Sequence, residues 1–313
     1  MRGRTSSLLS SQASTSAVRT SSMRCQIKFG DSSGAVTSSP ETSNSSVIRW
    51  MGSKRRLVDL IATRMPPVSD INYYYEPFLG SAAVFLRYAP ERAVLGDNNA
   101  DLMNAWKHIR KRPSAIWLAV SRIPVTSTDY YAIREAHRTN RESFTRAVHF
   151  IYLNRNCFNG VYRTNRKNHF NVPFGQNTGA LPPLQNFERC SQLLQSATLK
   201  VGDFARTLKD VGPGDVVYLD PPWPTLRANY GEYGYASSEP AVIRMQKVVE
   251  PLVERGADVY LSLPAAYGWQ FESGLTAEFA LTYSVASRAN HRRPTSEVLL
   301  VAGDRAVRAA RSA

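Results

Sequence analysis

Residues 215–223 read Asp-Val-Val-Tyr-Leu-Asp-Pro-Pro-Trp, and this stretch decides the fold. The β-branched and aromatic residues predict a buried strand, and the prolines after Asp220 cannot continue it. In open α/β sheets, ligands bind at the carboxyl ends of the strands. An acid, two proline carbonyls and the flat ring of Trp223 suit a planar base that carries an exocyclic amine, because the amine can donate to the carboxylate while the ring stacks on the base. Taken alone, the motif is equally typical of a strand that ends in a Pro-Pro turn.

Apolar runs alternate with helical patterns from Val47 onward. Strands are predicted at Tyr73–Glu76, Ala93–Asp97, Thr198–Val201, Asp215–Asp220, Asp258–Leu263, Phe279–Ala286 and Glu297–Val301. Helices are predicted between most of them, for example at Arg56–Arg64, Ala82–Tyr88, Asp101–Arg110 and Ala241–Arg255. This alternation predicts a parallel, doubly wound α/β sheet. The last two strands have no helix between them and are expected to form a hairpin at the sheet edge.

The second and third predicted strands are separated by about a hundred residues, far too many for a βα connection. We therefore expect a mainly helical subdomain with a hairpin at residues 105–195, inserted between the two parts of the sheet domain, residues 47–104 and 196–304. From Lys107 to Phe170 the chain has thirteen Lys and Arg against three acids, interleaved with tyrosine and phenylalanine. This mixture favours nucleic-acid binding over a merely solvated helical surface.

Composition limits the other classes of protein. Three distant cysteines and five histidines show no metal-ligand spacing and no disulfide framework, which indicates a reducing compartment and no metal. No apolar run is long enough to predict a membrane span. Residues 1–46 contain fifteen Ser and five Thr and are expected to be a disordered tail, with a transit peptide or an over-extended start codon as alternatives. Residues 305–313 are expected to form a second, short tail.

Polar or glycine-rich groups follow the other predicted strands. Residues 75–83 read YEPFLGSAA, in which Gly80 allows a ligand to approach the start of a helix closely. Asp97 ends the next strand, where an acid can accept hydrogen bonds from a ribose diol or can cap a helix. The Gly-Asp-Phe at 202–204 could face an adenine, although a helix cap is the stronger interpretation. Upstream, the RWMGSK at 49–54 is a plausible ligand clamp and is not a P-loop.

Five blocks in this order resemble the Dam-type family of adenine-specific DNA methyltransferases: RWMGSK, EPFLGSAAVFL, LGDNN, NRNCFNGVYRTNRKNHFNVPFG and YLDPPW. The resemblance covers about residues 47–303, and the fourth block is its most specific part. It implies a Rossmann-like, S-adenosylmethionine-dependent methyltransferase sheet with an inserted DNA-recognition subdomain.

The resemblance also assigns roles to individual residues. For S-adenosylmethionine it implies Trp50, Lys54, Glu76, Phe78, Gly80, Asp97, Asp203, Phe204 and Asp220. For catalysis it implies Asp220, Pro221, Pro222 and Trp223. For DNA binding it implies Arg49, Phe158, Asn159, Arg163, Asn165 and Pro173. Of these, Phe158 and Asn159 would disturb the base stack of the duplex or fill the gap that the flipped base leaves. The chain departs from the family at Trp223, where Tyr is usual, at Ser53 and Ser81, which stand at glycine positions, and at Leu261–Pro264, which replaces a Ser-Asn strand end.

The sequence thus predicts a site-specific enzyme that methylates the exocyclic amine of an adenine flipped out of duplex DNA. An RNA or nucleotide amine methyltransferase and a DNA-binding protein with a decayed site are the alternatives. GATC, the family's commonest target, is the expected site, and Arg163 is expected to read a guanine or to contact a phosphate. We expect a bacterial or phage-like, cytoplasmic protein at the nucleoid, with a cognate restriction endonuclease as a candidate partner and the oligomeric state left open.

Overall fold

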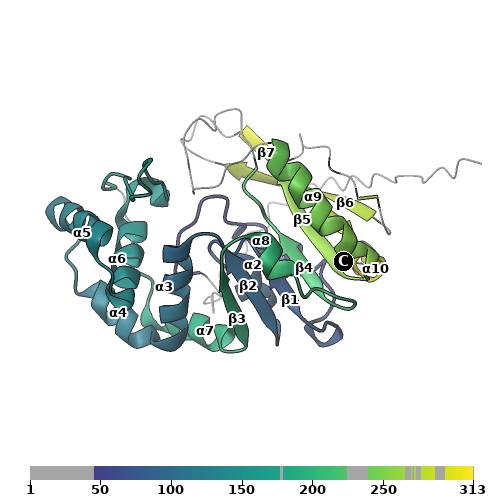
Figure 1. Cartoon of the computed structure of the whole chain (residues 1–313), viewed down its shortest axis with the longest axis horizontal. Helices are drawn as coiled ribbons and strands as arrows, with labels where there is room; N and C mark the ends of the chain where they lie inside the picture. Colours follow the sequence, from purple (N-terminus) through teal and green to yellow (C-terminus); the bar gives the residue numbers. More distant parts are fainter. Residues whose placement is uncertain are drawn as a thin grey trace, which may run out of the picture.

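The computed structural model describes residues 46–176, 179–223, 239–264, 269, 271–272, 276–285 and 293–312. A sheet covered by helices on both faces lies beside a group of helices, α3 to α6 (Figure 1). The predicted N-terminal tail lies outside the described residues except for Ser46, which is buried. Ala286, the predicted last residue of one strand, also lies outside them.

The sheet has seven strands in the order β3-β2-β1-β4-β5-β7-β6. Their bounds are β1 Tyr74–Glu76, β2 Ala93–Asp97, β3 Ala197–Val201, β4 Val216–Leu219, β5 Asp258–Pro264, β6 Thr276–Val285 and β7 Arg293–Ala302. The first five are parallel, and β7 runs antiparallel between β5 and β6. The predicted doubly wound sheet and its edge hairpin are therefore confirmed. The strand order reverses between β1 and β4, so the residues that follow these two strands meet at one crevice.

Helices cover both faces of the sheet, as successive strand residues point to opposite sides. One face packs its apolar residues, Tyr75 and Leu219 among them, with the buried side of α9 (Glu239–Glu254) and with α8 (Phe204–Leu208). The other face, with Tyr74 and Tyr218, packs with the helices α1 (Val58–Ala62), α2 (Ala83–Tyr88) and α10 (Asp304–Ser312). The sheet is thus buried on both faces, which fits its nearly continuous apolar strands.

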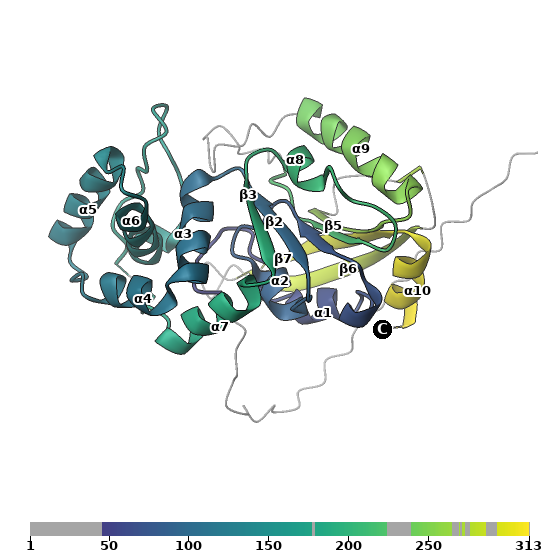
Figure 2. The same ribbon diagram turned by 60° about the horizontal axis from the view of Figure 1, so that its bottom comes forward.

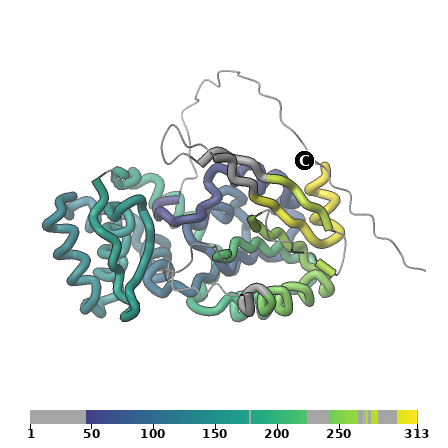
Figure 3. The backbone as a smooth tube through the Cα atoms, turned by 90° about the horizontal axis from the view of Figure 1, so that it is seen from above, coloured from purple at the N-terminus to yellow at the C-terminus, as the bar shows by residue number. Residues whose placement is uncertain are grey.

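Most of the inserted segment is helical. It comprises α3 (Ala100–Lys111), α4 (Pro113–Ser121), α5 (Ser127–Thr139), α6 (Ser143–Asn156) and α7 (Leu184–Leu194). Figure 2 shows α3 to α6 beside the sheet, beyond its β3 end, and in Figure 3 this teal part of the chain lies at one end of the molecule. Their buried residues, such as Trp106, Tyr130 and Phe150, belong to the same continuous apolar cluster as Tyr74 of β1. The insertion is therefore packed onto the sheet through a shared core.

Residues 157–175 leave the end of α6 and return to it, and we call this segment the 157–175 hairpin. It is closed by two antiparallel bridges, Cys157 with Phe174 and Thr164 with Phe170. At its turn, the backbone N–H groups of Lys167 and His169 donate to the side-chain oxygen of Asn165. The hairpin is thus held by local bonds, as the prediction of an inserted hairpin requires.

The C-terminal segment differs from its prediction. Residues 305–312, expected to be a tail, complete the helix α10, which buries Ala306, Val307 and Ala310. The side chain of Arg305 donates to Asp258 at the start of β5, at 2.5 Å. Three small apolar residues at helical spacing in an Arg- and Ala-rich stretch were too short a pattern to distinguish a packed helix from a polar end.

Candidate active site

Asp220 follows β4 and forms an ion pair with Lys54. The ammonium Nζ of Lys54 lies 2.8 Å from Asp220 Oδ1 and 3.5 Å from Glu297 Oε2 on β7. Burial raises the pKa of Asp220, and the nearby Lys54 opposes that shift. Burial alone would lower the pKa of Lys54, but the two carboxylates outweigh it and raise the pKa. The lysine thus favours the ionised form of a carboxylate that its buried surroundings would otherwise protonate.

Glu76 ends β1, the strand beside β4, and is buried. The Tyr74 hydroxyl donates to Glu76 Oε2 at 2.7 Å, and the Phe85 N–H donates to the same oxygen at 3.2 Å. Burial nevertheless raises the pKa of Glu76 to about 8, with a further contribution from Asp220. A carboxyl group in this position is ionised at neutral pH when a cation comes close to it. This part of the site therefore suits a positively charged ligand.

Gly80 lies in the loop between β1 and α2 and holds two neighbours. Its backbone is left-handed, with φ of +46°, and a Cβ atom there would lie 2.6 Å from Trp50 Cδ1. Its N–H donates to Asp97 Oδ2 at 3.0 Å. The Trp50 ring in turn stacks on Tyr162 of the 157–175 hairpin, with centroids 5.4 Å apart. The structure therefore brings Trp50, Gly80 and Asp97 together as predicted, and it adds Tyr162.

Asp97 is not the cap of α3. That role belongs to Asn99, whose side chain accepts from the Leu102 N–H at 2.9 Å. Asp97 Oδ1 accepts from the Asn99 N–H at 2.9 Å, so each carboxylate oxygen fixes a neighbouring loop. Each oxygen has a second lone pair, with which it can accept from a ligand hydroxyl.

Ser53 and Ser81, which stand at family glycine positions, are hydrogen-bonded to each other with their oxygens 2.7 Å apart. Neither residue has a positive φ, whereas the neighbouring Gly52, Gly80 and Ala82 do. Side chains at these two positions therefore cost no backbone strain. The bond joins the loop that carries Lys54 to the loop that carries Gly80.

Asp203 and Phe204 lie after β3. Asp203 caps α8 by accepting from the Ala205 N–H at 3.0 Å, which confirms the interpretation as a helix cap. Arg244 of α9 forms a bidentate pair with Asp203, with N···O distances of 2.8 and 2.6 Å, and this pair lowers the pKa of the Asp203 carboxyl. The Phe204 ring stacks on Phe78 with centroids 5.5 Å apart. Two of the residues predicted to contact S-adenosylmethionine, Phe78 and Phe204, thus form one aromatic pair.

Trp223 follows Pro221 and Pro222 and is fixed by a bond that Tyr could not make in the same way. Its indole N–H donates to the Ser262 carbonyl of β5 at 3.0 Å, and its ring meets Trp269 edge to face. Ser262 belongs to the strand end that departs from the family. The Trp223 ring is thus anchored by a backbone carbonyl, which any residue at 262 would provide.

The 157–175 hairpin presents the predicted DNA-contacting residues outside the core. The Phe158 ring is 54% exposed, and Asn159 beside it is also exposed, with a left-handed backbone at φ 53°. The Pro173 carbonyl accepts from the Phe158 N–H at 2.9 Å, and this bond ties the two predicted contact points together. Arg163 Nε donates to Asn171 at 3.0 Å, and this bond leaves the two terminal nitrogens of the guanidinium for a partner.

Arg49 is brought to the same hairpin by a reciprocal pair. Its N–H donates to Asn154 Oδ1 at 2.9 Å, and Asn154 Nδ2 donates to the Arg49 carbonyl at 2.7 Å. Its guanidinium lies against Gly160, where a Cβ atom would come within 2.5 Å of Nε. The loop at 49–54 therefore contacts both the sheet and the hairpin.

Comparison with known proteins assigns the family. The family model for the D12 class N6 adenine-specific DNA methyltransferases matches residues 50–288. The chain belongs to this family. It is an adenine-specific DNA methyltransferase, as the sequence predicts.

Individual relatives agree with this assignment. The type II methyltransferase M1.LlaDCHI of Lactococcus lactis is 32% identical over 228 residues, which are 68% of this chain and 79% of the relative. The DNA adenine methylase of Haemophilus influenzae is 34% identical over 207 residues, 64% of this chain and 71% of the relative. The type II methyltransferase M.MjaIII of Methanocaldococcus jannaschii is 29% identical over 266 residues, 77% of this chain and 91% of the relative.

Besides Tyr162, four residues of this methyltransferase site escaped the sequence reasoning. Glu297 and Ser262 come from β7 and β5, and their approach to Lys54 and Trp223 depends on strand pairing over long separations. Arg244 lies on the exposed side of α9 and resembles any solvated arginine in sequence. Asn154 belongs to the most family-specific block, and that was a usable signal.

Two general findings complete the description of the methyltransferase. Among the described residues, no group of three or more His, Cys, Asp and Glu side chains could hold a metal ion. The helices in the described part of the chain fall short of the length and apolarity that a bilayer span needs.

Proposed function

We propose that this methyltransferase uses S-adenosylmethionine to methylate the exocyclic amine of an adenine flipped out of duplex DNA. One observation supports this most. Glu76 and Asp220 stand at the ends of adjacent strands, where the strand order reverses, with Lys54 beside Asp220. A cation-binding carboxyl group and a carboxylate able to accept from an amine thus share one crevice.

The residues around this crevice fit the proposed methyl donor. Bound S-adenosylmethionine would supply a sulfonium methyl group, which is electrophilic because its leaving group is a neutral thioether. Glu76 would lie toward the positive charge, Asp97 would accept from the ribose, and Phe78 with Phe204 would flank the adenine. Gly80 leaves room for the Trp50 ring against the loop before the helix, and Trp50 and Lys54 border the same crevice. Asp203 would hold the adenine side through its pair with Arg244.

Asp220 and the Pro221 carbonyl would accept hydrogen bonds from the two hydrogens of the target amine. This arrangement favours a pyramidal nitrogen whose lone pair is directed at the methyl group, so that the acceleration comes from alignment and electrostatics. Trp223 would stack on the extruded base, and Pro222 stiffens the turn between the two groups. Lys54 would keep Asp220 ionised and so able to accept.

The insertion at residues 105–195 is the proposed DNA-recognition subdomain. Phe158 has the exposed ring that a wedge between base steps requires, and Asn159 and Pro173 lie beside it. Arg49, Arg163 and Asn165 are the proposed contacts to bases or phosphates, and GATC is the proposed target. A DNA substrate implies work at the nucleoid of a bacterial or phage-infected cell, in the cytoplasm. A cognate restriction endonuclease belongs to the same proposal, because two relatives are type II methyltransferases by name.

Incubation with unmethylated genomic DNA and S-adenosylmethionine, followed by base-resolved mapping of methyladenine, tests this proposal. We expect methyladenine at one short sequence, GATC in the first instance. A single-stranded RNA that contains the sequence of the methylated DNA site serves as the comparison substrate. Faster transfer to RNA, or binding of DNA without any transfer, would contradict the proposal and support one of the alternatives.

A further inference from the structure

A basic cavity separates the 157–175 hairpin from the helices beneath it, and none of the roles assigned above uses it. Its volume is about 460 Å³. Four segments line it: the residues at the start of α3, the end of α5 with the loop after it, Arg146 of α6, and residues of the hairpin between 162 and 170. Its basic lining residues are His137, Arg138, Arg141, Arg146, Lys167 and His169. We call it the basic cavity.

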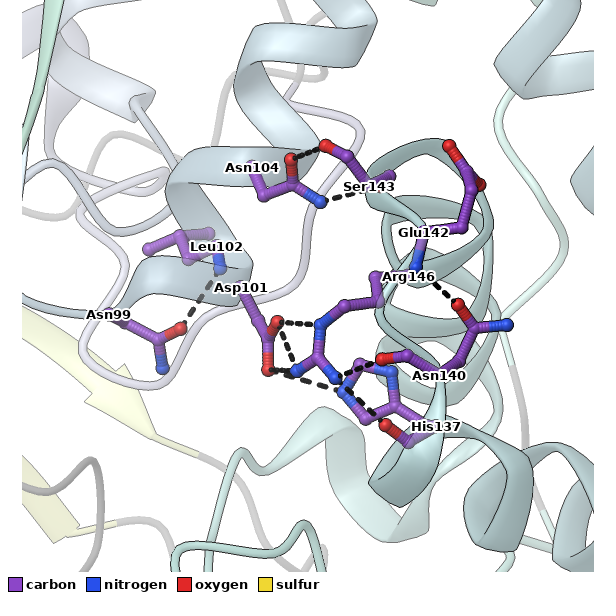
Figure 4. A network of polar contacts seen from close by, with 9 residues as sticks. All are labelled: Asn99, Asp101, Leu102, Asn104, His137, Asn140, Glu142, Ser143 and Arg146. Atoms are coloured by element: carbon purple, nitrogen blue, oxygen red, sulfur yellow. Dashed lines mark hydrogen bonds and ion pairs between the residues drawn. The ribbon is translucent and has the colours of Figure 1, made fainter.

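The one acid that lines the basic cavity is already neutralised. Arg146 donates to both oxygens of Asp101, at 2.6 and 2.8 Å from Nη2 and at 3.0 Å from Nε, and His137 Nε2 lies 3.2 Å from the same carboxylate (Figure 4). Burial opposes ionisation of Asp101, but His137 and Arg146 outweigh it and lower its pKa. The carboxylate therefore has little charge left for the other cations.

The remaining cations of the cavity differ in whether they have a partner among the described residues. Arg141 and Lys167 are exposed and form no ion pair with any described residue, whereas Arg138 pairs with Glu135 outside the lining. His137 is 4% exposed, yet its Nδ1 atom has no hydrogen-bond partner among the described residues, and neither has the buried Nε of Arg138. Buried polar atoms without partners are uncommon in folded proteins, and the Nε of Arg138, which can only donate, indicates a missing acceptor.

The start of α3 adds to the positive potential. This helix has twelve residues, and Asn98 to Asp101 at its start line the cavity. The first N–H groups of a helix have no partner within it, and the aligned peptide dipoles place positive charge there. Two independent features, a cationic lining and a helix start, thus favour an anion in the same space.

We propose that the basic cavity binds a backbone phosphate of the DNA substrate. This inference rests on the proposed function, because the cavity shares the hairpin that would contact the DNA bases. Arg141 comes from the loop after α5 and Lys167 from the hairpin, so the helical part and the hairpin each contribute a cation to the lining for one phosphate group. The contact would fix the position of the hairpin on the duplex and carry no sequence information.

The test is the salt dependence of DNA binding by the full chain. Arg141→Ala and Lys167→Ala, alone and combined, remove exposed side chains and should leave the fold intact. Arg122→Ala and Lys111→Ala are matched controls, since both residues are exposed and lie outside the cavity lining. Affinity is measured by fluorescence anisotropy with a target duplex and a scrambled duplex over a range of salt concentrations.

We expect the combined cavity variant to make the slope of log K against log salt shallower by about 0.9, the value for one phosphate contact. The loss should be equal on both duplexes, and the controls should keep the wild-type slope. An unchanged slope, or an equal loss in the controls, would overturn the proposal. Thermal shifts with inorganic phosphate form a second arm. Stabilisation that the variants lose without any change in DNA binding would assign the cavity to a free anion and also overturn it.

Failure of the proposed function would look different. If the wild-type protein bound DNA with a steeper salt dependence than the cavity variant but transferred no methyl group, the proposed function would be contradicted and the phosphate contact would not. Conversely, normal methyl transfer by the combined variant at saturating DNA, together with an unchanged slope, would contradict the phosphate contact alone.

Discussion

The crevice at the carboxyl ends of β1, β2 and β4 differs from the 157–175 hairpin in how its polar groups are satisfied. In the crevice, Asp220 pairs with Lys54 and Asp97 holds the Gly80 loop, so the groups proposed to act on the ligands are largely removed from solvent and already positioned. In the hairpin, Phe158 and Asn159 are exposed, and their local bonds hold the backbone. Chemistry needs pre-organised groups in a dry site, whereas recognition needs groups free to meet a partner. Changes in the crevice should therefore reduce turnover, and changes in the hairpin should alter DNA binding.

Asp220→Ala should have the largest effect. It removes the acceptor for the target amine, so single-turnover methyl transfer should fall on the order of a thousandfold or more. DNA affinity should stay near wild type, because no phosphate contact is lost. A variant that keeps more than a tenth of the wild-type rate would remove Asp220 from the mechanism, and a large loss of DNA affinity would break the division between the two regions.

Glu76→Gln tests whether the buried carboxyl group strengthens ligand binding while it lowers the folding stability of the free protein. The variant should bind S-adenosylmethionine about tenfold to a hundredfold more weakly, as expected for loss of a charge-assisted bond. The pKa of Glu76 is about 8 in the folded chain, against 4.5 as its ordinary value, so the folded state binds the proton more tightly. The stability that comes from this bound proton is present below about pH 4.5 and is lost as the pH rises through about 8.

Urea unfolding at pH 5 and pH 8 measures this second effect. Through Glu76, the free energy of unfolding of the wild type should fall by on the order of a few kcal/mol from pH 5 to pH 8. The fall should be correspondingly smaller in the Gln variant. An identical pH dependence in both proteins would show that Glu76 is ionised in the free protein.

Trp223 is the next test, because it belongs to the crevice but would touch the DNA base. Trp223→Ala should lower kcat/KM by a factor that corresponds to a loss of roughly 1–3 kcal/mol of transition-state stabilisation, the range for loss of a stacked base. Trp223→Tyr should remain active, since stacking requires a flat ring. If the Tyr variant were as impaired as the Ala variant, the indole bond to the Ser262 carbonyl would be the essential feature in place of stacking.

The anchoring of Trp223 also shows what the sequence could and could not predict. Strand ends were readable, because runs of apolar and aromatic residues stop at Glu76, Asp97 and Asp220, and the parallel order brings such ends to one edge. The acceptor for Trp223 was not readable, because it is a backbone carbonyl, and such groups carry no sequence signal.

The partner of Lys54 illustrates a second limit. Glu297 lies in a strand whose neighbours depend on β7 being placed between β5 and β6, and local pattern does not determine that pairing. The hydrogen bond between Ser53 and Ser81 was hidden for a similar reason. The two serines are 28 residues apart in the chain, and only the fold shows that their hydroxyls meet.

Arg163→Ala examines the hairpin side of the comparison. If Arg163 reads a guanine, the variant should lose about 1–3 kcal/mol on the mapped site and relax discrimination at one base pair. Arg166→Ala is the matched control, as Arg166 is an exposed arginine of the same hairpin. Kinetics on duplexes altered one base pair at a time measure the effect. Uniform weakening on all duplexes with a shallower salt dependence would assign Arg163 to the backbone.

The Ser53–Ser81 bond should have the smallest effect and gives the finest test of pre-organisation in the crevice. A neutral hydrogen bond contributes about 0.5–1.5 kcal/mol, so Ser53→Ala or Ser81→Ala should weaken S-adenosylmethionine binding by about two- to tenfold. Because the two hydroxyls depend on each other, the double variant should be no weaker than either single variant. Ser121→Ala is the control, since that hydroxyl donates to its own helix at Leu118. Calorimetric affinities for the four proteins complete the cycle. Additive losses would mean that each serine acts alone, and that the loops carrying Lys54 and Gly80 are positioned by their backbones without this bond.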